Sequence, residues 1–245
     1  MAKIDNSYNQ FEELNRQITA CEKCPRLAAY RREIARVKRR AFRDADYWGK
    51  PVPGFGDENA RVLIVGLAPG AHGSNRTGRM FTGDDSGRFL YGALHRAGFA
   101  NQPTAVDRSD GLVLKDVYIT AVGRCAPPDN KPTGEELTNC RPYLVRELDL
   151  QHNLRGVVAL GKIAYDSMQR LLRERGHNIP QVQFGHNAFS MDEQTGFWLL
   201  GSYHPSRQNT QTGRLTEAMF DKIWLKVKGN LAVSEKEIIK PNELR

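Results

Sequence analysis

The chain has 245 residues, of which 40% are hydrophobic, and its mean hydropathy is −0.57. This length suits one large α/β domain or two small ones. No run approaches the ~20 consecutive apolar residues of a membrane helix, and residues 1–15 lack the apolar core of a signal peptide. We therefore expect a cytoplasmic protein that does not contact a membrane. The net charge of +8 and the pI near 9.4 favour a polyanionic partner, with a generic basic protein as the alternative.

Two helices are predicted at the start of the chain, over residues 7–19 and 26–42. The first has apolar residues on one stripe, and the second begins after Pro25, which suits a first helical turn. Residues 26–43 carry seven arginines and one lysine against a single acid, Glu33. A solvated face is the ordinary interpretation of such a charge run, and contact with phosphates is the functional hypothesis.

The chain has four cysteines, Cys21, Cys24, Cys125 and Cys140. Disulfides are not expected in a cytosolic protein. Cys21 and Cys24 have a metal-ligand spacing, whereas the second pair is too widely spaced for a zinc ribbon. Four thiolates at irregular spacing suit an iron–sulfur cluster. The alternatives are a zinc site and four unrelated buried thiols.

A short apolar run, residues 62–65, predicts a buried parallel strand, and a long Gly-rich loop follows it. Loops at the carboxyl ends of such strands bind ligands in open α/β sheets. The loop has neither the Gly-Lys-Ser/Thr of a P-loop nor a correctly placed G-x-G-x-x-G, so both kinds of nucleotide loop are excluded. A helix is predicted over 87–97.

The rest of the chain alternates predicted strands and helices. A strand over 116–122 leads into a stiff loop with three prolines, and Thr133-x-x-Glu136 forms a capping box that begins the next helix. The later elements are a strand over 156–160, a helix over 161–173, a strand and loop over 181–190, a strand over 197–200, a loop over 201–214, a helix over 215–227 and a polar tail from 230.

This order predicts a three-layer α/β/α fold with a central four-stranded parallel sheet. We expect a single domain over residues 1–228 and a C-terminal tail over 229–245. The loops after the first, second and fourth strands would meet at one edge of the sheet. They would bring Asp84, Asn130 and His204 into one cleft.

Several motifs in these loops resemble those of the uracil-DNA glycosylase superfamily. They are Gly66-Leu67-Ala68-Pro69-Gly70, Phe81-Thr82-Gly83-Asp84, and the segment from His204 to Arg214. The chain is most similar to family 5, the iron–sulfur-containing type b enzymes, from Cys21 to about Trp224. The resemblance implies that the four cysteines hold a [4Fe–4S] cluster, which we expect to be structural.

The resemblance also implies a function: a DNA repair glycosylase that flips a deaminated base out of duplex DNA and hydrolyses its N-glycosidic bond. Uracil, hypoxanthine and xanthine are the expected bases, and base excision repair the pathway. Leu67 and Ala68 replace the polar catalytic side chain that families 1 and 4 carry, which points to Asp84 as the substitute. The alternative function is a non-catalytic iron–sulfur protein that binds nucleic acid.

The expected catalytic residues are Asp84, Asn130 and His204. The residues expected to contact the base are Gly66, Leu67, Ala68, Gly70, His72, Phe81, Asn130 and His204. An aromatic ring can stack on the base, an amide can read its edge, and a histidine can stabilise the departing anion. Each also has a structural alternative: Phe81 as core, Asp84 or Asp85 as a helix cap, Asn130 as a turn residue, and His72 and His204 as loop braces.

The residues expected to contact DNA are Arg76, Arg79, Ser206, Arg207, Gln208, Asn209 and Arg214. Residues 201–215 contain no acid, and their polar side chains suit phosphate and minor-groove contact. We expect a monomer that acts on double-stranded DNA with water as the acceptor.

Overall fold

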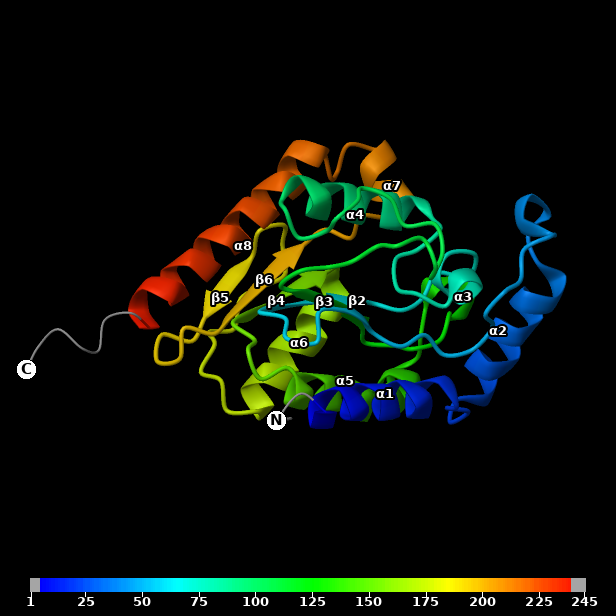
Figure 1. The fold of residues 1–245 in the computed structure, drawn as a ribbon, viewed down its shortest axis with the longest axis horizontal. Helices are drawn as coiled ribbons and strands as arrows, with labels where there is room; N and C mark the ends of the chain where they lie inside the picture. The colour runs from blue at the N-terminus through cyan, green and yellow to red at the C-terminus, as the bar shows by residue number, and fades with distance from the viewer. Residues whose placement is uncertain (1–4, 239–245) are drawn as a thin grey trace, which may run out of the picture.

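The computed structural model describes residues 5–238, so that residues 1–4 and 239–245 lie outside the described part (Figure 1). In chain order the elements are α1 (Asp5–Thr19), α2 (Pro25–Val37), the 3-10 helix η1 (Arg40–Phe42), β1 (Phe55–Gly56), β2 (Val62–Gly66), α3 (Ser74–Thr77), α4 (Asp85–Arg96), β3 (Val117–Ala121), η2 (Pro128–Asn130), α5 (Gly134–Leu150), β4 (Gly156–Leu160), α6 (Lys162–Glu174), β5 (Phe189–Met191), β6 (Trp198–Ser202), α7 (Arg207–Gln211) and α8 (Glu217–Ile238).

The sheet has six strands in the order β1-β3-β2-β4-β6-β5. The four central strands are parallel and fully buried, which confirms the predicted parallel sheet. The short edge strands β1 and β5 pair antiparallel and were not predicted as part of it. From β2 the chain goes first to β3 on one side and later to β4 on the other. The strand order therefore reverses between β2 and β4. Open α/β sheets bind ligands in the crevice at such a reversal, at the carboxyl ends of the strands.

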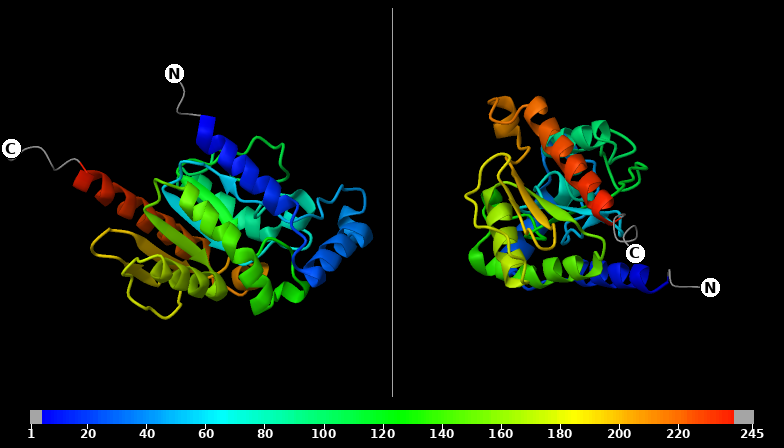
Figure 2. Two further views of the ribbon diagram at one scale, coloured as in Figure 1. Left: turned by 90° about the horizontal axis from the view of Figure 1, so that it is seen from below. Right: turned by 90° about the vertical axis from the view of Figure 1, so that its left-hand side faces the viewer.

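Helices cover both faces of the sheet, as predicted (Figures 1 and 2). On one face, Ile64 of β2 belongs to a core cluster with Leu94 of α4 and Trp224 of α8. On the other face, Leu63 belongs to a cluster with Leu144 of α5 and Met168 of α6. Successive residues of one strand thus point into two separate cores, as the period of a strand requires. The result is the three-layer α/β/α architecture.

Helix α2 lies beyond the carboxyl edge of the sheet, next to α3 (Figure 1). It ends at Val37, five residues earlier than predicted, because Lys38 adopts a left-handed conformation with φ of 56°. The chain then turns through η1 and returns toward the sheet. The early end of this helix matters because it places residues 38–48 against the loop that follows β2.

Helix α8 continues to Ile238, past the predicted domain boundary at residue 228. Leu231 is only 4% exposed and belongs to the same core cluster as Val227. The predicted boundary at residue 228 therefore falls inside α8, and Leu231 extends the apolar stripe of the helix beyond it. Within the described residues, no helix combines the length and the apolar character that crossing a membrane requires.

Candidate active site

Asp84 caps the N-terminus of α4 and also faces the Gly-rich loop. Its Oδ1 accepts a hydrogen bond from the backbone N–H of Gly87 at 2.9 Å. Its Oδ2 lies so close to Gly73 that a Cβ at that position would approach to 1.9 Å. Burial raises the pKa of Asp84, against the opposing effect of the Gly87 hydrogen bond. One oxygen is thus used by the helix, and the other is directed into the loop after β2.

Phe81 and His204 form an aromatic pair between the loops that follow β2 and β6. Their ring centroids are 5.7 Å apart with an interplanar angle of 30°. A Cβ at Gly66 would lie 2.9 Å from the Phe81 ring, so the glycine makes room for it at the end of β2. Phe81 is 8% exposed and has a φ of 51°, which is unusual for a bulky residue. It is both a core residue and a wall of the site.

Burial lowers the pKa of His204 to about 4. The imidazole is therefore neutral near pH 7 and can present one N–H donor. The carbonyl of His204 accepts a hydrogen bond from the Asn209 amide at 2.9 Å, which fixes the backbone of this loop.

Asp85, which competed with Asp84 for the catalytic role, points outward. It is exposed and forms an ion pair with Arg88, and Arg207 approaches it at 4.0 Å. Of the two neighbouring carboxylates, only Asp84 is directed toward the Gly-rich loop. Asp84 therefore stays the predicted catalytic carboxylate.

The loop after β3 is joined directly to the loop after β2. The backbone N–H groups of Val122 and Gly123 donate to the carbonyls of Gly66 at 3.0 Å and Leu67 at 2.8 Å. Asn130 lies further along this loop, exposed and in a left-handed turn conformation with φ of 56°. Its side chain makes no hydrogen bond within the described residues. The backbone of Asn130 is therefore that of a turn residue, which was the structural alternative for this position. The contact of its side chain with a base stays a prediction.

His72 is held by a residue that the sequence did not single out, Tyr47. The Tyr47 hydroxyl lies 3.0 Å from His72 Nδ1 and also accepts from the backbone N–H of Arg39 at 3.4 Å. Burial lowers the pKa of His72, and the positive charge of Arg39 adds to the effect. The contact uses Nδ1 of the ring, and its donor or acceptor role there follows from the tautomer of His72. The brace alternative therefore holds for one nitrogen of His72.

Comparison with known proteins decides the family. The model of the uracil DNA glycosylase superfamily matches residues 53–228. The chain belongs to this superfamily. A type-5 uracil-DNA glycosylase of Mycobacterium tuberculosis is 52% identical over 217 residues, covering 88% of this chain and 80% of the relative.

Two further relatives carry the same name. The type-5 uracil-DNA glycosylase of Thermus thermophilus is 52% identical over 86% of this chain and 94% of its own length. That of Pyrobaculum aerophilum is 42% identical over 88% of this chain and 91% of its own length. These similarities confirm the family predicted from the sequence motifs.

In this member of the superfamily, Arg79 does not reach the surface. It is 4% exposed, pairs with Asp110 at 2.6 Å, and stacks on the ring of Phe55. Burial alone would raise the pKa of Asp110, but the hydrogen bonds from Arg79 and from backbone N–H groups lower it to about 2. The predicted DNA contact of Arg79 is therefore wrong, because this arginine holds the loop over residues 101–111 against the glycosylase core.

Arg76 braces the Gly-rich loop. Its guanidinium donates to the carbonyls of His72 at 2.9 Å and Gly83 at 2.8 Å, and it lies 4.1 Å from the centroid of the Phe42 ring. A loop without regular structure leaves carbonyls that need donors, and this arginine supplies two. Its contact with DNA stays a prediction.

The segment after β6 contains the short helix α7, which Ser206 caps by accepting from the Asn209 N–H. The side chains of Arg207, Gln208 and Arg214 are exposed, and Arg214 also lies 4.8 Å from the ring centroid of Tyr203. Asn209 is used inside the loop, as its bond to His204 shows. The DNA contacts of this segment stay predictions.

The four cysteines are free thiols drawn from three parts of the chain. The amide of Asn139, next to Cys140, approaches Cys24 Sγ at 3.6 Å. Burial raises the pKa of Cys125 to about 12, the nearby Arg31 opposes this effect, and Cys140 and Cys21 add to it. The charges of Cys140 and Cys21 thus act on Cys125, and thiolates are the ligands that an iron–sulfur cluster takes. Among the described residues, however, no group of three or more His, Cys, Asp or Glu has the geometry to hold a metal ion.

Proposed function

We propose that this protein is a uracil-DNA glycosylase that hydrolyses the N-glycosidic bond of deaminated nucleotides in duplex DNA, the first step of base excision repair. The observation that carries the proposal is the contact between two loops at the carboxyl edge of the sheet. The loop after β2 holds Asp84 and Phe81, and the Phe81 ring stacks on the neutral His204 imidazole of the loop after β6. The superfamily membership and the names of the relatives support the same activity.

A base inside a duplex must be extruded before its glycosidic bond can be reached. Phe81 then offers a ring face to the flipped base, and Asn130 offers an amide to its edge. Backbone N–H groups of the Gly-rich loop approach its carbonyl oxygens, as Gly66 and Gly70 permit. Shape and backbone contacts of this kind suit hypoxanthine and xanthine as well as uracil.

In the proposed reaction the bond between C1′ and the base nitrogen breaks, and its electron pair leaves with the base. The neutral His204 ring donates a hydrogen bond to the resulting anion, in the manner of an oxyanion hole. The sugar develops positive charge, which the Asp84 carboxylate stabilises. A water oxygen bonds to C1′, and Asp84 accepts the proton that this water loses.

We also propose that Cys21, Cys24, Cys125 and Cys140 hold a [4Fe–4S] cluster. When bound, the cluster supplies a structural cross-link, and the reaction does not require its redox chemistry. The thiols come from the α1–α2 connection, the loop after β3 and helix α5. The contact of Asn139 with Cys24 brings α5 to the α1–α2 connection, and the irregular spacing of the cysteines suits Cys₄ ligation; both support this proposal.

The direct test is a single-turnover excision assay on matched duplexes that contain uracil, hypoxanthine or xanthine. Alkali treatment after the reaction cleaves abasic strands and so reports base release. We expect release of uracil at least, and none from a duplex with ordinary bases. The alternative, a non-catalytic nucleic-acid-binding protein, predicts DNA binding without release of any base.

A further inference from the structure

We propose that residues 38–43, here called the basic turn, bind the phosphates of duplex DNA beside the flipped nucleotide, as a second contact separate from α7. This inference rests on the proposed function, because it specifies how the substrate of that site is held. The basic turn connects the end of α2 to the segment that returns to the sheet. Residues 38–42 were predicted as the last part of a helix. In the structure α2 ends at Val37, and the basic turn follows it as a separate segment.

The cations of α2 itself are already paired with acids. Arg26 pairs with Glu136 at 2.6 Å, and Arg36 pairs with Glu33 at 2.7 Å. Arg32 pairs with Glu22 at 2.6 Å. These charges are largely neutralised within the protein, so the arginine-rich helix is a weaker phosphate site than its sequence suggests.

The cations of the basic turn have no such partners. Lys38, Arg39, Arg40 and Arg43 form no ion pair within the described residues, and the three arginines are exposed. The acids nearest in sequence, Asp44 and Asp46, are exposed and follow the turn. The basic turn therefore presents four charges that are available to an anionic ligand.

The basic turn is attached to the loop that carries Asp84. The Phe42 ring packs 4.1 Å from the Arg76 guanidinium, and Arg76 donates to the carbonyl of Gly83, the residue before Asp84. The returning chain adds a backbone bond from Trp48 to Arg76 at 2.8 Å. The turn is therefore fixed to the site instead of extending as a flexible arm, and a phosphate bound there has a defined position relative to the catalytic carboxylate.

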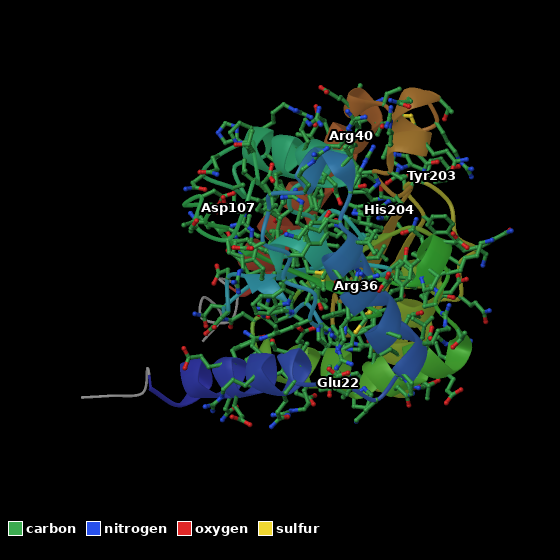
Figure 3. All side chains as sticks on the ribbon, turned by 90° about the vertical axis from the view of Figure 1, so that its right-hand side faces the viewer. Glu22, Arg36, Arg40, Asp107, Tyr203 and His204 are labelled. Atoms are coloured by element: carbon green, nitrogen blue, oxygen red, sulfur yellow. The ribbon has the colours of Figure 1, made fainter. Side chains whose placement is uncertain are left out.

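The position of the turn matches what base flipping requires. Figure 3 shows Arg36 and Arg40 on the face of the molecule on which His204 and Tyr203 also lie. In Figure 1, α2 and α7 lie on opposite sides of α3 at the same edge of the sheet. Extruding a nucleotide costs free energy that contacts to the flanking backbone must offset. Cations on both sides of the site can hold the strand on both sides of the flipped residue.

The test measures the salt dependence of affinity for a duplex that contains 2′-fluoro-2′-deoxyuridine, an analogue that resists cleavage. The variant is Lys38→Gln/Arg40→Gln/Arg43→Gln. The matched control, Arg155→Gln/Arg170→Gln/Arg173→Gln, removes the same charge from exposed residues before β4 and on α6. Each phosphate contact contributes about 0.9 to the slope of log affinity against log salt concentration. We therefore expect the slope to fall by about 2 to 3 in the first variant and to be unchanged in the control.

Equal slopes for the first variant and the unmodified chain would overturn the proposal, as would an equal loss in both variants. The single substitution Arg40→Gln, expected to lower the slope by about 1, guards against misfolding of the triple variant. The two proposals fail in different ways. Normal uracil release with an unchanged slope refutes only the basic turn. A reduced slope in a protein that releases no base refutes only the glycosylase activity.

Discussion

Asp84 has two carboxylate oxygens in two different environments, and this explains how one residue can serve both structure and chemistry. Oδ1 caps α4, and Oδ2 faces the glycine loop. Substitution by asparagine keeps the capping oxygen, since Asn and Asp are similar N-caps. The substitution therefore removes the charge with little effect on the helix.

We expect Asp84→Asn to lower the single-turnover rate of uracil release by about 10²- to 10⁴-fold, with little change in DNA affinity. The matched control is Asp85→Asn, because Asp85 points outward toward Arg88. Rates for the control should stay close to those of the unmodified chain. An equal loss in both variants would show that the local negative charge matters, and not the position of Asp84.

His204 gives a prediction about pH. Its pKa in the fold is about 4, below the ordinary value near 6.5, because the ring is buried. Between these values the unfolded chain binds a proton that the folded chain does not, so the free energy of unfolding falls as the pH drops from about 6.5 to about 4. The contribution is fully present above pH 6.5.

Imidazole NMR titration of the folded protein should show one histidine that stays neutral to about pH 4, and His204→Gln should remove that signal. The same variant should weaken the pH dependence of unfolding across the window. The difference between the two proteins isolates His204, because burial also lowers the pKa of His72 and His186. A titration of His204 near 6.5 would contradict its assignment as a neutral donor.

At the scale of the elements, α8 offers a pair of leucines that test its length. Leu231 is 4% exposed in the part of the helix that had been predicted as tail, and Leu225 is 66% exposed. We expect Leu231→Ala to lower the free energy of unfolding by about 2 to 5 kcal/mol, as for other buried leucines. Leu225→Ala should change it by less than about 0.5 kcal/mol. Urea unfolding of both variants measures the difference, and equal stabilities would mean that the helix is frayed before residue 231.

The N-terminal helices give a second prediction at this scale. If the four thiols hold an iron–sulfur cluster, Cys125→Ala should abolish visible absorbance near 400 nm, lower the iron content and lower the melting temperature. Thr138→Ala, on an exposed position of α5, is the control. Full colour and iron in Cys125→Ala would refute the cluster, and zinc without colour would indicate the metal alternative.

The elements also show which parts of the fold the sequence could predict. The predicted strand over 156–160 coincides with β4, because a continuous apolar run bounded by glycines has few alternatives. The edge strand β1 was missed, and β5 overlaps only the end of the strand and loop predicted over 181–190, since two and three residues are too few to show a clear pattern. Helix α3 was hidden inside the glycine-rich loop for the same reason, with only four residues.

The site was predictable where it follows a strand and unpredictable where it depends on distant packing. Asp84 and His204 were predicted because the loops that hold them follow apolar runs that end in glycine. Phe42 ends η1 and Tyr47 follows it, and only the early end of α2 brings them onto His72 and Arg76. Nothing in their sequence spacing indicates that contact.

For the whole molecule, the net charge of +8 is a poor guide to which cations a polyanion can reach. Arg31, Arg79 and Arg124 are 2%, 4% and 1% exposed, and each pairs with an acid within the protein. Composition cannot separate these structural arginines from exposed cations. The separation requires the fold, and it leaves the exposed cations of the basic turn and α7 as the surfaces proposed to contact DNA.

The side chains at the carboxyl edge of the sheet also bear on whether the reaction leaves an intact abasic strand or a nicked one. A glycosylase that nicks the strand needs an amine that can form a Schiff base, commonly a lysine whose pKa is lowered by its surroundings. The loops assigned to the cleft contain one lysine, Lys131, and it is exposed in the turn after Asn130. No carboxylate or second amine pairs with it within the described residues. Water, activated by Asp84, is therefore the expected acceptor.

We predict that borohydride treatment during the reaction traps no covalent protein–DNA adduct, and that the strand stays intact until alkali is added. Lys131→Ala should release uracil like the unmodified chain, because an exposed lysine outside the chemistry contributes little to the barrier. Denaturing gels of the treated reactions measure both outcomes. An adduct that forms with the unmodified chain and disappears in Lys131→Ala would instead make Lys131 the nucleophile, because hydrolysis by water leaves no imine for borohydride to reduce.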